Sequence, residues 1–276
     1  MATVILIWSG SFIFIRVGLR DVPPATLALA RFSIASPLMI AYMSLSRRNM
    51  TNPQIRWKKD GALFIALGLT GGSLFYVLQF YSLKFVTSTV GSILINLNVI
   101  FTTVLSTLFL KEVITRRKLI GIFLAFIGVT VLSIEGQLSF GSFRPVGILL
   151  MVGAAFCWAA YTILGKKTLH RYSASATTCI TFCVGTILLI PFALAETSPT
   201  ILLRVSLIGW ISILYLAVPS SAIAYVLWNY MLSRVEATKL AVSLYAIPIP
   251  TAILSYLFLG ENLTLLLALG GVLVTA

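Results

Sequence analysis

The pentapeptide LFLKE at residues 108–112 recurs as LFLGE at residues 257–261, 149 positions further along the chain. The same register holds without a gap from Tyr76, which meets Tyr225, to the last residue of the sequence. Apolar sequence matches itself by chance, but at a much lower rate than this stretch does. We therefore infer an internal duplication.

The duplication extends toward the start of each half, because a shift of 150 places Trp8 on Trp158 and Phe32 on Phe182. We predict two domains, residues 1–140 and residues 141–276. The first half has fewer residues before Trp8 than the second has before Trp158, and the second half stops short of the first. We therefore expect the natural protein to extend at both ends.

The composition excludes a water-soluble protein. Of the 276 residues, 59% are hydrophobic and 10% are charged, whereas soluble domains carry about 45–50% apolar and about 25% charged residues. The three cysteines lie in apolar stretches and predict neither a disulfide nor a metal site.

Apolar blocks recur at the length that spans a bilayer, about 20 residues. Continuously apolar blocks in lipid must be helices, because only helices satisfy their backbone groups internally. The first block contains Arg16 and lacks the basic start and cleavage site of a signal peptide. We predict an all-α integral membrane protein with ten transmembrane helices. They cover 2–19, 25–46, 61–82, 86–110, 119–135, 146–165, 174–195, 205–231, 240–259 and 262–276.

The net charge of +13 reports membrane topology rather than nucleic-acid binding, because the cations lie in short gaps between apolar blocks. With a cytoplasmic amino terminus, 14 of the 20 Lys and Arg residues fall in inside connections, as the positive-inside rule requires. We expect a multi-pass protein of a prokaryotic plasma membrane, in contact with lipid and not with nucleic acid.

Five helices in each repeat make the second repeat inverted relative to the first. The cations agree, since Arg116, Arg117 and Lys118 follow Glu112 whereas leucines follow Glu261. Inverted repeats are an architecture of secondary transporters, with the binding site near the midplane. The sequence therefore predicts a carrier.

Several short motifs resemble the drug/metabolite transporter superfamily, in its ten-helix EamA-type branch, over essentially the whole chain. They are Trp8-Ser9-Gly10, Pro24 with Ala30-Arg31-Phe32, Leu110-Lys111-Glu112 with Gly121 and Gly128-Val129, and the copy Gly260-Glu261-Asn262 with Gly270-Gly271-Val272. The resemblance implies transport of amino acids, other metabolites or drugs, in the export direction. One departure is Asn96-Leu97-Asn98, where a proline is expected.

Arg31 is the first candidate site residue, because a charge inside a bilayer is costly. It either meets a substrate carboxylate in a water-filled cavity or has a structural role among helices. Arg16 and its equivalent Lys166 lie nearer helix ends, so we expect them to reach outward to the membrane surface.

Pro248 and Pro250 interrupt the ninth helix, since each removes a backbone donor. Such an interruption marks a hinge or binding site, or merely a kink. The repeat register places Asn96 opposite Tyr245, and Asn98 lies at the same depth, so we predict a polar chamber there.

Aromatic and polar residues in mid-helix complete the predicted lining, although each alone is also explained by packing or by an interfacial belt. Aromatic faces suit amphipathic or cationic solutes. The candidates are Trp8, Tyr76, Gln79, Trp158, Tyr161, Tyr225, Trp228 and Asn229.

Glu112 and Glu261 end the fourth and ninth helices, and we expect them to cap the following helix or pair with loop cations rather than contact substrate. Other carboxylates lie at helix ends or in loops. This favours facilitated or exchange transport, or coupling through these two residues.

The leading hypothesis is thus a transporter that exports amino acids or related small metabolites by alternating access. A nucleotide-sugar or sugar-phosphate exchanger and a non-transporting scaffold or receptor are the alternatives. One histidine, His170, and no paired carboxylates argue against an enzyme. We expect no cofactor and no metal, and a functional monomer, because duplication supplies both halves.

The predicted orientation has a direct test. In a variant lacking Cys157, Cys179 and Cys183, a cysteine introduced at Trp57 should react only from the cytoplasmic side and one at Phe140 only from the outside. Labelling of intact cells with an impermeant maleimide measures this, and the reverse pattern contradicts the orientation.

Overall fold

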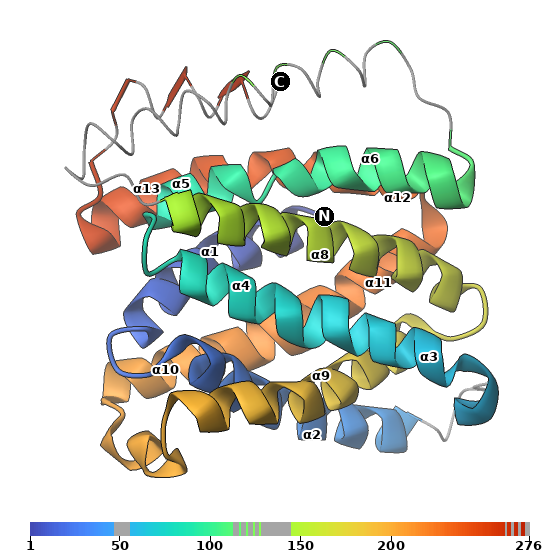
Figure 1. Cartoon of the computed structure of the whole chain (residues 1–276), viewed down its shortest axis with the longest axis horizontal. Helices are drawn as coiled ribbons and strands as arrows, with labels where there is room; N and C mark the ends of the chain where they lie inside the picture. The colour runs from blue at the N-terminus through green and yellow to red at the C-terminus, as the bar shows by residue number, and fades with distance from the viewer. Residues whose placement is uncertain are drawn as a thin grey trace.

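The computed structural model describes residues 1–46, 56–112 and 145–262, with isolated positions between 116 and 127 and between 264 and 273. Regular structure in these ranges is helical, and the long helices lie side by side as a bundle (Figure 1). Seven helices are long and apolar enough to cross a membrane, and α1 is a shorter apolar helix of 17 residues. The expected helices 119–135 and 262–276 fall largely outside the described residues.

The described part of the first repeat contains α1 (Ala2–Gly18), α2 (Pro24–Ser46), a rod of α3 (Trp57–Gly68), η2 (Leu69–Ser73) and α4 (Leu74–Ser82), and the pair α5 (Ser88–Leu94) and α6 (Leu97–Leu110). The second contains α8 (Pro145–Leu169), α9 (Ala174–Glu196), η3 (Pro199–Arg204), a rod of α10 (Leu207–Ala217), η4 (Val218–Ile223) and α11 (Ala224–Arg234), and a rod of α12 (Ala237–Val242), η5 (Ser243–Ala246) and α13 (Pro248–Leu259). These bounds agree with the corresponding predicted spans to within a few residues.

Large apolar side chains cover the outside of the bundle. Leu149, Ile187 and Phe258 are 67%, 65% and 71% exposed, and they have many exposed apolar neighbours. Soluble monomers rarely expose apolar patches of such extent. This surface fits the hydrocarbon core of a membrane.

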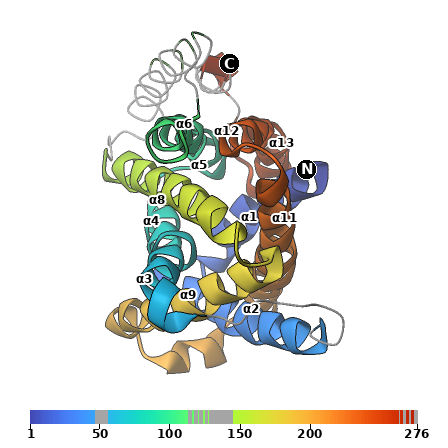
Figure 2. The same cartoon turned by 90° about the vertical axis from the view of Figure 1, so that its right-hand side faces the viewer.

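The two repeats are interleaved rather than stacked as separate units. The first helix of each repeat packs on the other repeat. α1 packs on α10 and α11, and α8 packs on α3 and α4. The second helices, α2 and α9, pack on each other (Figure 2). Each repeat therefore buries its apolar faces mainly against the other.

Equivalent residues of the two repeats touch each other directly. Such self-contacts occur only along a two-fold axis, so the repeats are related by a pseudo-two-fold axis through these residues. The contacts are Trp8–Trp158 with ring centroids 5.1 Å apart, Phe32–Phe182 at 4.9 Å, and the hydroxyl pairs Ser36–Thr186 at 2.8 Å and Tyr76–Tyr225 at 2.6 Å.

The repeated pentapeptide forms the same turn in both halves. Lys111 ends α6 and Gly260 ends α13, and both have left-handed backbone, with φ of 58° and 66°. The amide of the next glutamate then donates to the carbonyl of the residue six positions before it, at 3.3 Å in each repeat. This helix-ending motif turns Glu112 and Glu261 out of their helices.

Both glutamates cap a helix of the opposite repeat. Glu112 accepts hydrogen bonds from the first amide of α12 and from the hydroxyl of Thr238. Glu261 accepts from the amides of Ser88 and Thr89 at 2.8 and 3.1 Å, and from the Thr89 hydroxyl at 2.8 Å. The bonds that the structure describes thus go across the pseudo-axis, whereas the expected partners, the following helices and loop cations, lie largely outside the described residues.

Arg16 and Lys166 perform the complementary task at helix carboxyl ends. Arg16 donates to the carbonyls of Leu83 and Val86, just beyond α4. Lys166 donates to the carbonyls of two residues at the end of α11, at 2.7 and 2.6 Å. Both cations therefore bind carbonyls that a helix end leaves unpaired, and their extension to the membrane surface stays a prediction.

We expect Glu261→Ala to destabilise the protein by about 1–2 kcal/mol, the usual loss for a helix cap. Glu236→Ala is the matched control, since Glu236 is exposed and its ion pair among the described residues is with exposed Lys239; its effect should stay below about 0.5 kcal/mol. Unfolding in detergent measures both, and equal effects would refute the capping role.

Candidate functional site

A cavity of about 50 Å³ lies between the two repeats. One water needs about 10–15 Å³, so the cavity holds a few waters in this conformation. Its wall is mainly apolar and aromatic, and Arg31 is the charged residue among the described residues that line it. The wall consists of Trp8, Ser11, Phe12, Ile15, Arg31, Phe75, Tyr76, Gln79, Ile95, Asn96, Asn98, Trp158, Ser220, Leu244 and Ile247.

Arg31 is held by the opposite repeat. Its Nε donates to the hydroxyl of Ser221 at 2.8 Å and its Nη2 to the hydroxyl of Ser220 at 3.2 Å. The guanidinium carbon lies 4.3 Å from the ring centroid of Tyr76. The residue is only 1% exposed. Two of the five guanidinium N–H donors thus bind serine, and the charge is kept at the cavity without a carboxylate partner among the described residues.

Both serines lie in η4, where the helix opens into a π turn. The equivalent part of the first repeat, η2, is also π-helical. Such turns leave backbone groups for other partners, and the Ser220 carbonyl accepts from the indole Nε1 of Trp8 at 3.1 Å. Sequence reasoning missed Ser220 and Ser221. The available signal was their repeat position opposite Gly71 and Gly72.

Tyr76, which lines the cavity, is hydrogen-bonded to Tyr225 behind it, with the two hydroxyl oxygens 2.6 Å apart. Tyr225 is fully buried and donates its proton to the carbonyl of Gly71 at 2.8 Å. Each hydroxyl carries one proton, so Tyr76 must donate to Tyr225. The Tyr225 ring also packs edge-on against Trp158, with centroids 5.4 Å apart.

The predicted lining residues divide into two sets. The cavity wall contains Trp8, Arg31, Tyr76, Gln79, Asn96, Asn98 and Trp158. The other candidates, Tyr161, Tyr225, Trp228, Asn229 and Tyr245, are not part of that wall. Asn229 shows why: its amide donates to Tyr161 at 2.7 Å and to Thr178 at 2.9 Å, so it joins buried helices instead.

Helix interruptions occur at equivalent places in both repeats. In the second, η5 separates α12 from Pro248, the first residue of α13, and Pro250 follows within that helix. In the first, α5 and α6 part at Ile95 and Asn96 without a proline. The Ile95 carbonyl accepts from both the side-chain amide and the backbone N–H of Asn98, at 2.6 and 3.0 Å. Neither proline lines the cavity, and their role as hinges stays a prediction.

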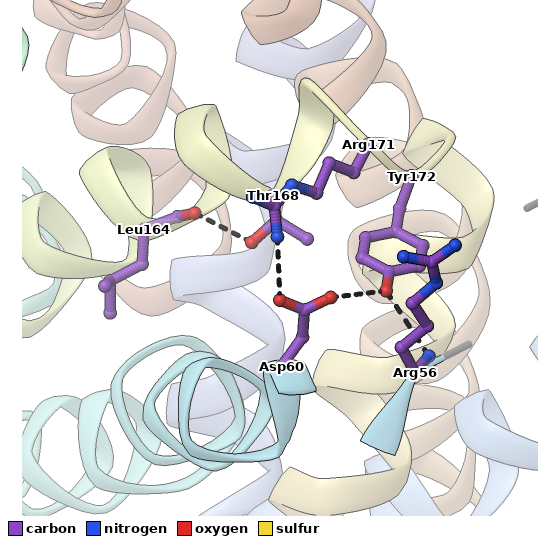
Figure 3. A network of polar contacts seen from close by, with 6 residues as sticks. All are labelled: Arg56, Asp60, Leu164, Thr168, Arg171 and Tyr172. Carbon is purple, nitrogen blue, oxygen red and sulfur yellow. Dashed lines mark hydrogen bonds and ion pairs between the residues drawn. The ribbon is translucent and has the colours of Figure 1, made fainter. Parts of the chain in front are cut away.

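A polar network away from the cavity joins α3 to the loop between α8 and α9 (Figure 3). Asp60 accepts from Tyr172 at 2.7 Å and pairs with Arg171 at 2.9 Å. Burial and the adjacent carboxylate raise the pKa of Tyr172, so the phenol remains a donor. Arg171 is 60% exposed and adds little, so the Tyr172 bond is the main tie.

These features define a class of protein. An all-helical membrane bundle, built twice from one repeat around a cavity that residues of both repeats line, has the design of a membrane carrier. The comparison with known sequences is specific: the EamA-like transporter family matches residues 1–134 and again 145–276. The chain belongs to the EamA-like transporter family and is a transporter, not an enzyme.

Relatives and a solved structure agree with this assignment. The chain is 37% identical to an uncharacterized transporter of Archaeoglobus fulgidus, over 100% of this chain and 93% of that protein. It is 28% identical to a probable amino-acid metabolite efflux pump of Salmonella typhimurium, over 99% and 90% of the two chains. A crystal structure with 19% identity superposes with a TM-score of 0.71 over 99% and 91%, which shows the shared fold.

The two axial tyrosines should differ in their contribution to stability. Tyr76→Phe removes one hydrogen bond, at a cost of about 1 kcal/mol, whereas Tyr225→Phe also leaves the Gly71 carbonyl without its donor and should cost about twice as much. Unfolding of the purified variants measures the difference. An equal or reversed order contradicts the assigned donor directions.

Proposed function

We propose that the protein exports amino acids or related small metabolites by alternating access around the cavity between the two repeats. The observation that carries this is the position of the cavity: Arg31 of the first repeat is bound by Ser220 and Ser221 of the second. A rocking motion of one repeat against the other changes exactly these contacts. The Salmonella typhimurium relative is named a probable amino-acid metabolite efflux pump, which supports the substrate class and the direction.

The small size of the cavity supports the rocking motion. A space that holds a few waters is too small for most metabolites, so the repeats must move apart to admit one. The caps at Glu112 and Glu261 also join the two repeats. Such a motion either breaks these hydrogen bonds or turns about them.

The same geometry supports facilitated or exchange transport over coupling through a deep carboxylate. No carboxylate lines the cavity among the described residues. Glu112 and Glu261 hold helix ends, which removes them as candidates for a proton relay at the site.

The proposal includes ten transmembrane helices as inverted repeats, a cytoplasmic amino terminus, a prokaryotic plasma membrane and a functional monomer. The pseudo-two-fold axis and the distribution of cations support the inversion. A nucleotide-sugar or sugar-phosphate exchanger is less well supported, because its dianionic substrate needs more cations than Arg31 alone. Nothing observed favours a scaffold or receptor.

Arg31→Gln should lower amino-acid flux in proteoliposomes by at least about tenfold, because charge-assisted hydrogen bonds are the strong ones. Arg234→Gln is the matched control. Arg234 lies at the end of α11, with its guanidinium carbon 4.5 Å from the Tyr230 ring centroid and away from the cavity wall.

Flux should remain close to wild type in Arg234→Gln, and both variants should elute as monodisperse protein. If Arg31→Gln keeps wild-type flux, Arg31 does not belong to the substrate-binding site.

A further inference from the structure

The amides of Asn96 and Asn98 carry polar atoms that the protein leaves without partners. Asn96 is 1% exposed, and neither its Nδ2 nor its Oδ1 has a hydrogen-bond partner. Asn98 is 2% exposed, and its Oδ1 is likewise unpaired. Both residues line the cavity. Buried polar groups in native proteins are normally paired, so these atoms point to a ligand.

The chemistry of the two amides is complementary to that of Arg31. The Asn98 Nδ2 donates to the Ile95 carbonyl, which leaves its oxygen to face other partners as an acceptor. Asn96 offers a second acceptor and one donor group. Arg31 offers only donors. The cavity therefore combines an anion-binding group on α2 with hydrogen-bond acceptors at the break between α5 and α6.

The rest of the wall selects against a second charge. Phe12, Ile15, Phe75, Leu244 and Ile247 supply apolar surface. One cationic residue and neutral amide acceptors suit a solute that is neutral overall but carries one anionic and one donor group. A dianionic phosphate ester does not fit this set, and neither does a simple organic cation.

We propose that Asn96 and Asn98 form the amino-group subsite of a zwitterionic substrate, an apolar α-amino acid whose carboxylate binds Arg31. This rests on the proposed transport function and names its substrate class. The amide oxygens accept from the ammonium group, and the apolar wall contacts the side chain. The break between α5 and α6 then has a role in recognition as well as in movement.

The wild-type protein provides the first test. Proteoliposomes are assayed for exchange of labelled L-leucine, L-methionine and L-phenylalanine, with N-acetyl and methyl-ester derivatives of the best substrate as competitors. The acetyl group removes the ammonium and keeps the carboxylate, and the ester does the reverse. We expect each derivative to compete at least about tenfold more weakly than the parent amino acid, as expected for lost hydrogen bonds to a charged group.

Asn96→Leu provides the second test, because it removes no hydrogen bond within the protein. It should weaken the parent amino acid about tenfold and leave competition by the N-acetyl derivative unchanged, so that discrimination between the two disappears. Thr102→Val is the matched control: Thr102 lies in α6, the helix that Asn96 precedes, is fully buried with an unpaired hydroxyl, and is not in the cavity wall. It should keep wild-type discrimination.

The outcomes separate the two proposals. If wild type exchanges none of these three amino acids, the subsite falls, and the proposed function falls with it when polar amino acids and related metabolites show no exchange either. If it exchanges them but the N-acetyl derivative competes as well as the parent, transport stands and the amino-group subsite is wrong. A third outcome is that wild type loses exchange when choline replaces sodium, whereas Asn96→Leu does not. This outcome would assign the amides to a coupling ion and also overturn the inference.

Discussion

Every helix leaves terminal N–H and C=O groups that it cannot pair itself, and these groups must find partners elsewhere. In this protein charged side chains supply several of these partners. Glu112 and Glu261 exchange places as caps of α12 and α5, and Arg16 and Lys166 bind the carbonyl ends of the neighbouring rods. The two glutamate caps tie the repeats to each other, whereas Arg16 and Lys166 each bind a helix end of their own repeat.

The cavity is a product of the same constraint. Regular helices consume their own backbone groups, so a polar site in a helical bundle needs places where the helix is irregular. Here these are the π turns η2 and η4 and the breaks at Asn96 and Ser243. The carbonyl of Ser220 and the hydroxyls beside it become available only because the helix widens there, and they hold Trp8 and Arg31 in place.

Hydropathy and the LFLKE repeat were sufficient to predict the spans that the structure describes, the duplication and about half of the cavity wall, because apolar length and residue identity are local properties. The partners of those residues were not predictable in the same way. Ser220 meets Arg31 across 189 positions, after a π turn that breaks the 3.6-residue spacing on which helical faces are assigned. Asn229 and Tyr161 are polar and mid-helix like Asn96, yet they pair with each other. Only the three-dimensional packing separates a polar contact between helices from one that lines a cavity.

The Tyr76–Tyr225 pair sets a limit on how symmetric the molecule can be. Two hydroxyls on a two-fold axis cannot both donate to each other, so one of them must be the donor and the other the acceptor. In this structure Tyr76 donates to Tyr225, and Tyr225 donates to the Gly71 carbonyl. The carbonyl of Ser220, which is equivalent to that of Gly71, accepts from the Trp8 indole instead, and the Trp158 indole has no partner. The arrangement related to this one by the two-fold rotation, in which Tyr76 donates to the Ser220 carbonyl and the Trp158 indole donates to the Gly71 carbonyl, contains the same number of hydrogen bonds. Equivalent residues of the duplicated chain therefore differ in their hydrogen bonds at the pseudo-axis.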